Sequence, residues 1–332
     1  MNYIVFDLEW NQAKSNFKKN NNKNSEVYKN MPFEIVEIGA VKLDENFKTI
    51  GTFNRLIKPT FYKKMNPVIT KITGIQDVNL KHQKDFPAVV KDFFNWCGED
   101  YMMCTFGNQD IYELGINIHY HGMEIPWKYP CYYIDVQRIF GIVYGSENEQ
   151  KSLEAASIYM GVSTKKAYHR AYNDALYTAE VLKKLNREQV LANLSMDYLV
   201  LPETHKMEKE SDLGTHLEYV SAPYASKEEM LDDKKIYITR CPECMKKCKK
   251  KIRWFLDGSK YICIAKCENH GLMEGVLYTK HNYRGYFAVK KTMQTNQERY
   301  ESISAKKVAI REKRRLKRMK DTQKENQKKV EG

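Results

Sequence analysis

The sequence predicts an α/β domain with a mixed sheet flanked by helices, followed by a second, smaller domain that holds most of the cysteines. Residues 3–10 are apolar apart from two acids, a composition typical of a strand covered on both faces. Strand-like and helix-like patterns then alternate as far as residue 186, as in an α/β sheet with helices packed on it. Five of the eight cysteines crowd into residues 241–267, which indicates a separate unit.

The two acids of the first strand, Asp7 and Glu9, are two positions apart. They therefore point to the same face, about 7 Å apart along the strand. Paired carboxylates at the edge of a core repel each other and lose hydration unless a cation lies between them. The pair thus favours a divalent-metal site, and the alternative is a solvated strand end.

The remaining elements of the first domain follow from the same two patterns. A polar loop over residues 12–30, rich in Asn and Lys, separates the first strand from a predicted hairpin. Pro87 suits the first turn of one helix, and Gly74 suits the end of another. The expected strands cover 35–43, 47–57, 101–106 and 132–134, and the expected helices cover 66–75, 86–96, 136–140, 152–161 and 168–185, with one more beginning at residue 110.

Three further polar residues border these later elements. Asp110 follows the strand at 101–106, where α/β sheets present ligand-binding groups, although a helix-capping acid is the ordinary alternative. Asp174 borders the apolar stripe of the last helix. His169 is five residues earlier, about 140° away on a helix, so it can share a site with Asp174 only from the preceding loop. By itself it would more often be a surface or capping histidine.

Composition limits the partners. Net charge is +13 and the pI is about 9.1, which indicates an anionic partner, first of all nucleic acid. No apolar run has membrane-spanning length, and the first residues lack a signal-peptide pattern. A cytoplasmic protein without a membrane partner is the simplest expectation. In a reducing compartment, clustered cysteines indicate metal ligands rather than disulfides.

Taken together, residues 1–186 resemble the DEDDh branch of the DnaQ-like 3′→5′ exonucleases. Those enzymes carry Asp-x-Glu on the first strand, Asp after a later strand and His-x4-Asp on the final helix. The related branch would need tyrosine at Arg170. The resemblance implies an RNase H-like mixed sheet of five strands flanked by helices. The matching residues are Asp7-Leu8-Glu9, Asp110 and His169-x4-Asp174.

The resemblance also implies roles for these residues. Two Mg²⁺ or Mn²⁺ ions about 3.5–4 Å apart would stabilise the attacking and leaving oxygens of phosphodiester hydrolysis. Asp7 would bridge both ions, Glu9 and Asp174 would complete the site of the water-activating ion, and Asp110 would hold the second. His169 would be the general base, and the product would be a nucleoside 5′-monophosphate. The residues implied to hold the terminal nucleotide are Leu8, Trp10, Thr73 and Gly74.

Within the family, Ile72-Thr73-Gly74-Ile75 with Phe86-Pro87 and Trp96 is similar to exoribonucleases that trim histone mRNA and small-RNA ends, and to bacterial relatives. The Asn/Lys-rich insertion departs from that pattern. The resemblance thus implies single-stranded ends as substrate, with RNA preferred. A DNA 3′→5′ exonuclease of proofreading or repair is an alternative, and so is a nucleic-acid-binding protein without catalysis.

The second half of the chain predicts a helix and linker over 187–235, a zinc ribbon over 236–290 and a basic tail over 291–332. Cys241 and Cys244 form one metal-ligand turn, and a second turn follows about twenty residues later across strand-like sequence. The second pair is either Cys263 with Cys267, or Cys267 with His270. A site filled by four protein ligands would be structural. Cys248 is expected to be a bystander.

Basic and aromatic residues alternate in two parts of the ribbon, at 249–255 and 283–287. That mixture suits a single nucleic-acid strand, and the alternative is a small core with a solvated face. Residues 306–332 hold 12 Lys and Arg against 4 Asp and Glu, a net charge of +8. Either a helix that is polar on nearly all sides or a disordered tail would add salt-sensitive affinity there.

Overall fold

The computed structural model describes residues 1–12, 29–145 and 150–330, with side chains as far as residue 319. The polar loop predicted at 12–30 lies almost entirely outside the described residues. The chain divides into two compact units, Met1–Leu201 and Pro202–Gly332. In the described part, no helix combines the length and the apolar character that crossing a membrane requires.

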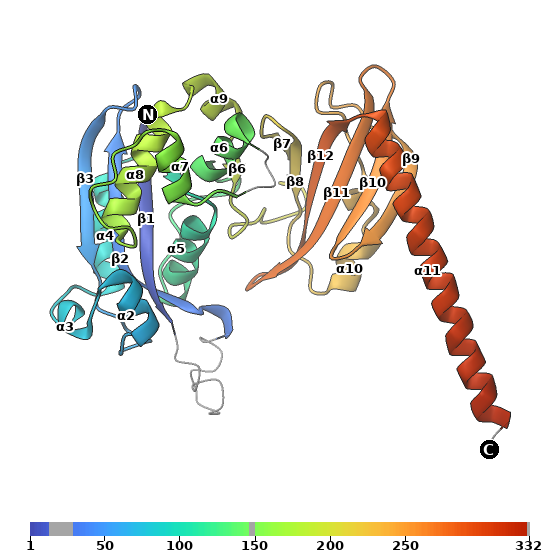
Figure 1. Cartoon of the computed structure of the whole chain (residues 1–332), viewed down its shortest axis with the longest axis horizontal. Helices are drawn as coiled ribbons and strands as arrows, with labels where there is room; N and C mark the ends of the chain where they lie inside the picture. The colour runs from blue at the N-terminus through green and yellow to red at the C-terminus, as the bar shows by residue number, and fades with distance from the viewer. Residues whose placement is uncertain (13–28, 146–149, 331–332) are drawn as a thin grey trace. The chain divides into compact units, whose positions relative to one another are not determined.

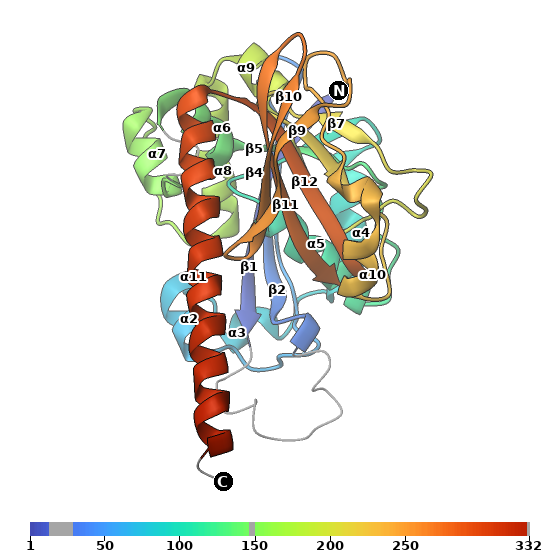
Figure 2. The same ribbon diagram turned by 90° about the vertical axis from the view of Figure 1, so that its right-hand side faces the viewer.

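The first unit is built on a mixed sheet with strand order β3-β2-β1-β4-β5-β6. Figure 1 shows the long strands β1, β2 and β3 of this sheet, and β4 and β5 are labelled in Figure 2. The pairs β1–β2 and β2–β3 are antiparallel, whereas β1–β4 and β4–β5 are parallel. This is the predicted RNase H-like arrangement, with a two-residue edge strand added. The strands are β1 (Asn2–Gln12), β2 (Phe33–Leu43), β3 (Thr49–Leu56), β4 (Tyr101–Thr105), β5 (Tyr132–Asp135) and β6 (Ser195–Met196).

Helices cover both faces of this sheet. Their bounds agree with the predicted ranges, with a longer α6, an additional short α3, and a short α9 at the helix predicted to begin the 187–235 segment. The chain leaves α9 early because Ser195 and Met196 pair with β5 as β6. The helices are α2 (Pro67–Thr73), α3 (Asp77–Leu80), α4 (Phe86–Cys97), α5 (Gln109–Tyr120), α6 (Val136–Tyr144), α7 (Leu153–Tyr159), α8 (Ala171–Lys184) and α9 (Arg187–Ala192).

Side-chain alternation along β1 assigns its residues to two cores. Ile4, Phe6 and Leu8 pack with side chains of α4 and α5. Tyr3 and Val5 pack with side chains of α6 and α8 on the opposite face. Because the side-chain period of a strand is two, positions 7 and 9 belong to the α8 face.

The start of α8 approaches the sheet unusually closely, at Gly39 on β2. A Cβ atom built on Gly39 would lie 2.0 Å from the backbone nitrogen of Tyr172 and 2.2 Å from the carbonyl carbon of Ala171. Only glycine permits this contact. Gly39 is the register partner of Asp7 across the β1–β2 pair. The first turn of α8 therefore lies over the strand pair at the level of Asp7.

The second unit is an antiparallel sheet with strand order β7-β8-β12-β11-β10-β9, and it is larger than the predicted ribbon. The prediction of a linker with little structure of its own before residue 235 is wrong, because residues 210–237 supply two strands and two short helices. The prediction that the tail begins at 291 is also wrong, because β12 continues through Thr295. The elements are β7 (Glu210–Asp212), β8 (Leu217–Val220), α10 (Lys227–Asp232), η2 (Lys234–Tyr237), β9 (Lys249–Asp257), β10 (Lys260–Cys267), β11 (Gly271–Asn282), β12 (Gly285–Thr295) and α11 (Gln297–Val330).

Buried charge pairs explain why the supposed linker folds despite its polar composition. Glu218 on β8 is 1% exposed, and its carboxylate lies 3.0 Å from His216 Nε2 and 3.1 Å from Lys291 Nζ. Glu210 on β7 lies 3.0 Å from Lys290 Nζ, which is also buried. Buried charges persist where they are paired and hydrogen-bonded. Hydropathy alone does not reveal such pairing.

The basic C-terminal segment is helical as far as Val330. In α11, Tyr300 and Ile303 pack on Ile252, Ile262 and Ile264 of the sheet. Arg299 binds the carboxylate of Glu274 through two hydrogen bonds of 2.8 and 2.7 Å. Beyond this anchor the helix extends past the strands of its own unit (Figure 2).

We predict that Gly39→Ala lowers the free energy of unfolding by about 1–3 kcal/mol or more, because its methyl group must push α8 away from β2. Chemical denaturation would measure the loss. Gly51→Ala is the matched control in the same sheet, since its Cβ would meet only ordinary contacts at 3.6 Å or beyond. Equal effects of the two substitutions would contradict a special role for the close approach.

Candidate active site and metal-binding cluster

Three carboxylates of the first unit converge at one place. Asp7 and Glu9 project from β1, and Asp174 lies in the first turn of α8. Each offers an oxygen atom, and these three atoms lie within 4.8 Å of one another. Residues 165 positions apart in the chain thus meet because α8 begins over Gly39. The predicted association of Asp7, Glu9 and Asp174 is present in the structure.

Asp110 reaches the same strand from the other side. It lies in the first turn of α5, is 6% exposed, and its Oδ1 accepts a hydrogen bond of 3.1 Å from the backbone nitrogen of Leu8. This bond ties Asp110 to the strand between Asp7 and Glu9. One turn along α5, Glu113 is also buried, and its Oε2 has no hydrogen-bond partner among the described residues. Glu113 is not among the candidate site residues predicted from the sequence.

His169 lies just before α8, in the loop position that the sequence requires. Its backbone φ of 64° is left-handed, which is uncommon for a residue with a side chain. Its backbone nitrogen donates a hydrogen bond of 3.0 Å to Oδ2 of Asp174. The side chain is exposed. The same carboxylate therefore holds the strained loop and contributes to the acid cluster.

An ion pair between the partly exposed Arg170 and the buried Glu37, which was not predicted from the sequence, supports this loop. Arg170 Nε and Nη2 donate to the two carboxylate oxygens of Glu37, at 3.0 and 2.7 Å. Glu37 is fully buried and pairs in register with Glu9 across the sheet. Because like charges in opposite positions repel, the guanidinium offsets the acid pair. The available signal was a lone glutamate within an apolar strand and a basic residue next to His169.

The acids have raised pKa values, chiefly because they are buried. Burial and repulsion from Asp110 and Asp174 raise the pKa of Asp7 well above its usual range. Burial and the neighbouring carboxylates raise the pKa of Glu9 to about 8. Burial also raises the pKa of Asp110 to about 7 and that of Asp174 to about 6, even though backbone N–H groups of Leu8 and His169 oppose the shifts. Clustered acids of this kind need protons or a cation.

The donor set fits a divalent metal. Oδ1 of Asp174 is buried and has no hydrogen-bond partner among the described residues. It lies in the group of carboxylates whose oxygens could share an ion. Hard cations such as Mg²⁺ and Mn²⁺ favour carboxylate oxygens, and Mg²⁺ keeps several of its waters. Asp7, Glu9 and Asp174 could thus hold one ion without further protein ligands.

The residues expected to hold a terminal nucleotide lie near the end of β1. Trp10 follows Glu9 and is half-buried, with its ring centroid 5.4 Å from that of Phe33. Thr73 is buried, and its Oγ1 accepts a hydrogen bond from Ile75 N. Gly74 ends α2 at a φ of 72°, and a Cβ built there would meet no atom within 4 Å. The side chain of Leu8 points into the core, and its backbone nitrogen is taken by Asp110.

Comparison with known families now assigns the class of protein. A family model described as exonuclease matches residues 4–182, more than half of the chain. The chain belongs to this exonuclease family. The predicted exonuclease domain is thereby confirmed, and the first unit is a nuclease domain with the DEDDh set of residues in the expected order.

Several solved structures are similar to the exonuclease domain in fold. The nuclease domain of 3′hExo bound to rAMP is 17% identical with a TM-score of 0.49, over 59% of this chain and 96% of that chain. A 3′-exonuclease studied for recognition of the histone mRNA stem-loop is 17% identical with a TM-score of 0.47, over 60% and 72%. Exonuclease I is 14% identical with a TM-score of 0.43, over 70% and 57%. Among curated proteins, none matches the chain.

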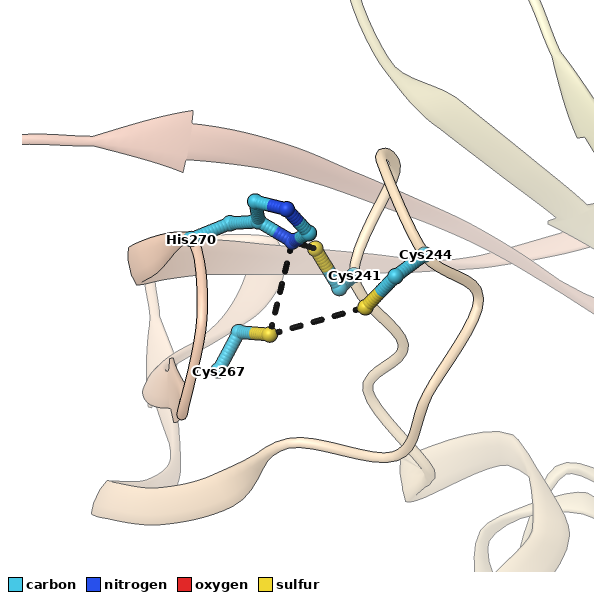
Figure 3. Close-up of side chains that lie close together, drawn as sticks. All are labelled: Cys241, Cys244, Cys267 and His270. Carbon is cyan, nitrogen blue, oxygen red and sulfur yellow. Dashed lines mark hydrogen bonds between the residues drawn. The ribbon is translucent and has the colours of Figure 1, made fainter.

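A second group of metal-ligating side chains lies in the other unit. Cys241, Cys244, Cys267 and His270 converge on one point (Figure 3). Sγ of Cys241 lies 3.3 Å from Nδ1 of His270, Sγ of Cys244 lies 3.6 Å from Sγ of Cys267, and the latter lies 3.7 Å from Nδ1 of His270. Ligands at 2.0–2.3 Å from a tetrahedral Zn²⁺ lie about 3.3–3.8 Å apart, so the spacing fits zinc.

The structure separates the two alternatives for the second ligand pair. Cys263 is fully buried in the sheet, and its Sγ lies 3.5 Å from Oγ1 of Thr239, outside the group of four. Cys248 also lies outside that group. Backbone N–H groups of Asn269 and His270 lower the pKa of Cys267 to about 6. The geometry thus favours His270 over Cys263 as the fourth ligand.

We predict that the protein without Mg²⁺ or Mn²⁺ loses thermal stability as the pH rises from about 4 to about 8. The folded acids have pKa values above the unfolded values of about 4, so the folded state holds more protons in this range. The free energy of unfolding therefore falls as these protons leave. Melting curves at several pH values would measure this. Mn²⁺ should raise the melting temperature more at pH 8 than at pH 6, and Glu9→Gln should flatten the pH dependence.

We predict that His270→Ala reduces the bound zinc, whereas Cys263→Ala leaves one zinc ion per chain. Three ligands hold the ion more weakly than four, and Cys263 lies outside the cluster. Elemental analysis after dialysis would count the zinc, and the absorption of the Co²⁺-substituted protein would report loss of a nitrogen ligand. Loss of zinc in Cys263→Ala with retention in His270→Ala would reverse the assignment.

Proposed function

We propose that the first unit is a metal-dependent 3′→5′ exonuclease that acts on single-stranded ends, prefers RNA and releases nucleoside 5′-monophosphates. The observation that carries this proposal is the convergence of Asp7, Glu9 and Asp174, with His169 hydrogen-bonded to Asp174. Membership of the exonuclease family supports the reaction class. The 3′→5′ direction of digestion and the single-stranded substrate are what the DEDDh pattern implies.

Four acids would hold two Mg²⁺ or Mn²⁺ ions, namely Asp7, Glu9, Asp174 and Asp110. When bound, the ions supply charge stabilisation for the attacking and the leaving oxygen of the phosphodiester. These roles are supported by the hydrogen bond from the backbone of Leu8 to Asp110 and by the position of Asp174 in the first turn of α8. The acids keep their geometry because each is fixed on a strand or in a first helical turn rather than on a loop.

His169 would act as the general base that accepts the proton of the attacking water. Its imidazole is exposed, so it can return that proton to solvent. The backbone bond to Asp174 and the Arg170–Glu37 pair hold the turn from which the ring projects. Histidine suits this role because its ordinary pKa lies near neutral pH.

The terminal nucleotide would lie across Trp10 and the turn at Thr73-Gly74, with its 3′-hydroxyl near Glu9. Open space at Gly74 and the half-buried indole of Trp10 support this placement. The preference for RNA is supported by the sequence pattern at residues 72–75, which is similar to exoribonucleases. For nucleotides with the same base, the 2′-hydroxyl group of the sugar is what distinguishes RNA from DNA, so a site that prefers RNA must contact it.

A DNA exonuclease of proofreading or repair uses the same chemistry and is the second candidate. A binding protein without catalysis is disfavoured by the acid cluster itself. A site that only binds a polyanion gains nothing from three close carboxylates, which repel phosphates. Their raised pKa values show how unfavourable the cluster is without a cation.

The test uses the purified full-length chain with 5′-labelled single-stranded RNA and DNA of one sequence, in Mg²⁺, Mn²⁺ or EDTA. We expect a ladder that shortens from the 3′ end, faster on RNA, and is absent in EDTA. Asp7→Ala should lower the rate by about 10³-fold or more, because an ion contributes several kcal/mol. His169→Ala should lower it by about 10²–10⁴-fold, the usual share of a general base.

Asp92→Asn is the control, since this carboxylate is exposed and lies in a surface ion pair with Lys84. It should retain the full rate. Faster DNA digestion would favour the second candidate. An unchanged rate in Asp7→Ala would exclude the metal mechanism, and binding without any ladder would favour the non-catalytic protein.

A further inference from the structure

The second unit contains a pocket that the zinc cluster and the catalytic acids do not explain. It lies between η2 and the edge strand β9, next to Tyr261 of β10, and has a volume of ≈ 1000 Å³. This is the upper end of the range for pockets that bind small molecules. All of its lining belongs to residues 234–261, so the pocket is complete within one unit.

The pocket is lined by cations and by no acid. Four of its basic residues are exposed, and in the described part of the chain none of the four forms an ion pair; they are Lys234, Lys247, Lys250 and Arg253. A fifth, Lys249, is paired with Glu268 at 2.8 Å. Ordinary surfaces mix both signs of charge. An unpaired group of four cations around one hollow is therefore a site for an anion.

Aromatic rings form the wall between these cations. Tyr237, Trp254 and Tyr261 line the pocket and are each only half-buried. The indole nitrogen of Trp254 donates a hydrogen bond of 3.0 Å to the carbonyl oxygen of Tyr237, which holds the ring in place. The ammonium of Lys250 lies 5.9 Å from the ring centroid of Tyr237. Fixed aromatic rings beside unpaired cations match a nucleotide, which has a flat base and a charged phosphate.

Irregular pairing of β9 separates this wall from the core. The register between β9 and β10 shifts twice, between Ile262 and Ile264 and again before Ala265. Shifts of this kind on an edge strand re-aim side chains. Ile252 and Phe255 pack under α11, whereas Trp254 packs with Tyr237 and Tyr261 on the pocket side. A regular strand would place Ile252 and Trp254 on the same face, so the irregular pairing is what separates Trp254 from the contact under α11.

We propose that this pocket binds a segment of single-stranded nucleic acid, with a base against the aromatic wall and phosphates at Lys250 and Arg253. The proposal deepens the proposed function and rests on it for the class of ligand. This pocket belongs to the unit without the acid cluster, so it would bind nucleotides of the strand independently of the 3′ end. Such attachment would be tolerant of sequence, because every base has a flat face.

The test measures binding without turnover, in the full-length chain carrying Asp7→Ala. Two double variants are compared by fluorescence anisotropy of a labelled single-stranded oligonucleotide. The first carries Lys250→Ala and Arg253→Ala, and the second carries Lys246→Ala and Lys251→Ala. Both pairs remove two exposed positive charges from neighbouring positions, and only the first pair lines the pocket. Zinc content and melting temperature verify that each variant is folded.

We expect the pocket pair to raise Kd about tenfold and to make the salt dependence shallower by about 1.4 in log–log slope, the value for two lost phosphate contacts on a single strand. The control pair should change Kd less than threefold. Equal effects of both pairs, or no effect of either, would overturn the proposal. Since turnover is absent, a failed nuclease assay would leave this result unaffected.

A second readout separates base stacking from charge. In a chain that also carries Trp10→Phe, oligonucleotide binding should quench tryptophan fluorescence. Adding Trp254→Phe should remove that quenching while binding persists, because phenylalanine keeps a ring for stacking. Inorganic polyphosphate, which has charge and no bases, should displace the strand poorly. Equal competition by polyphosphate, with no quenching by the oligonucleotide, would show a general anion surface and would overturn the base-binding part.

Discussion

The active site depends on one close approach, that of the first turn of α8 to Gly39. With no side chain at this position, the backbone of Tyr172 lies directly on β2, opposite Asp7. Asp174 is thereby carried within reach of Asp7 and Glu9. The packing contact and the catalytic geometry are therefore the same contact, and the helix cannot shift outward without opening the acid cluster.

This close approach brings several carboxylates together, and a neighbouring positive charge offsets only part of their repulsion. Burial brings the acids together and raises their pKa values, so the cluster is unfavourable when it is fully ionised without a cation. Arg170 is hydrogen-bonded to the buried Glu37, which is in register with Glu9. Its positive charge opposes part of the rise in the pKa of Glu9. One guanidinium does not neutralise this many carboxylates. The remaining negative charge favours a divalent cation at this site.

The positions of the proposed catalytic residues could be predicted from the sequence because each lies at a fixed place in an element with a clear period. The period of a strand places Asp7 and Glu9 on one face, and the 100° step of a helix requires His169 to precede α8. Glu37 and Arg170 could not be found in this way. Their pairing spans 133 positions and depends on the depth at which α8 packs, which no local pattern encodes.

The second unit was harder to predict because buried ion pairs, as well as apolar residues, hold β7 and β8. Glu210 and Glu218 are nearly buried on these short strands, and each forms an ion pair with a lysine of β12. Local periodicity finds a strand only when its buried face is apolar. In contrast, the spacing of Cys241 and Cys244 alone predicts a metal-ligand turn. A polar segment can thus be ordered by partners far along the chain. Lys250 and Arg253 line the pocket and form no ion pair in the described part of the chain, so their charges can serve a ligand.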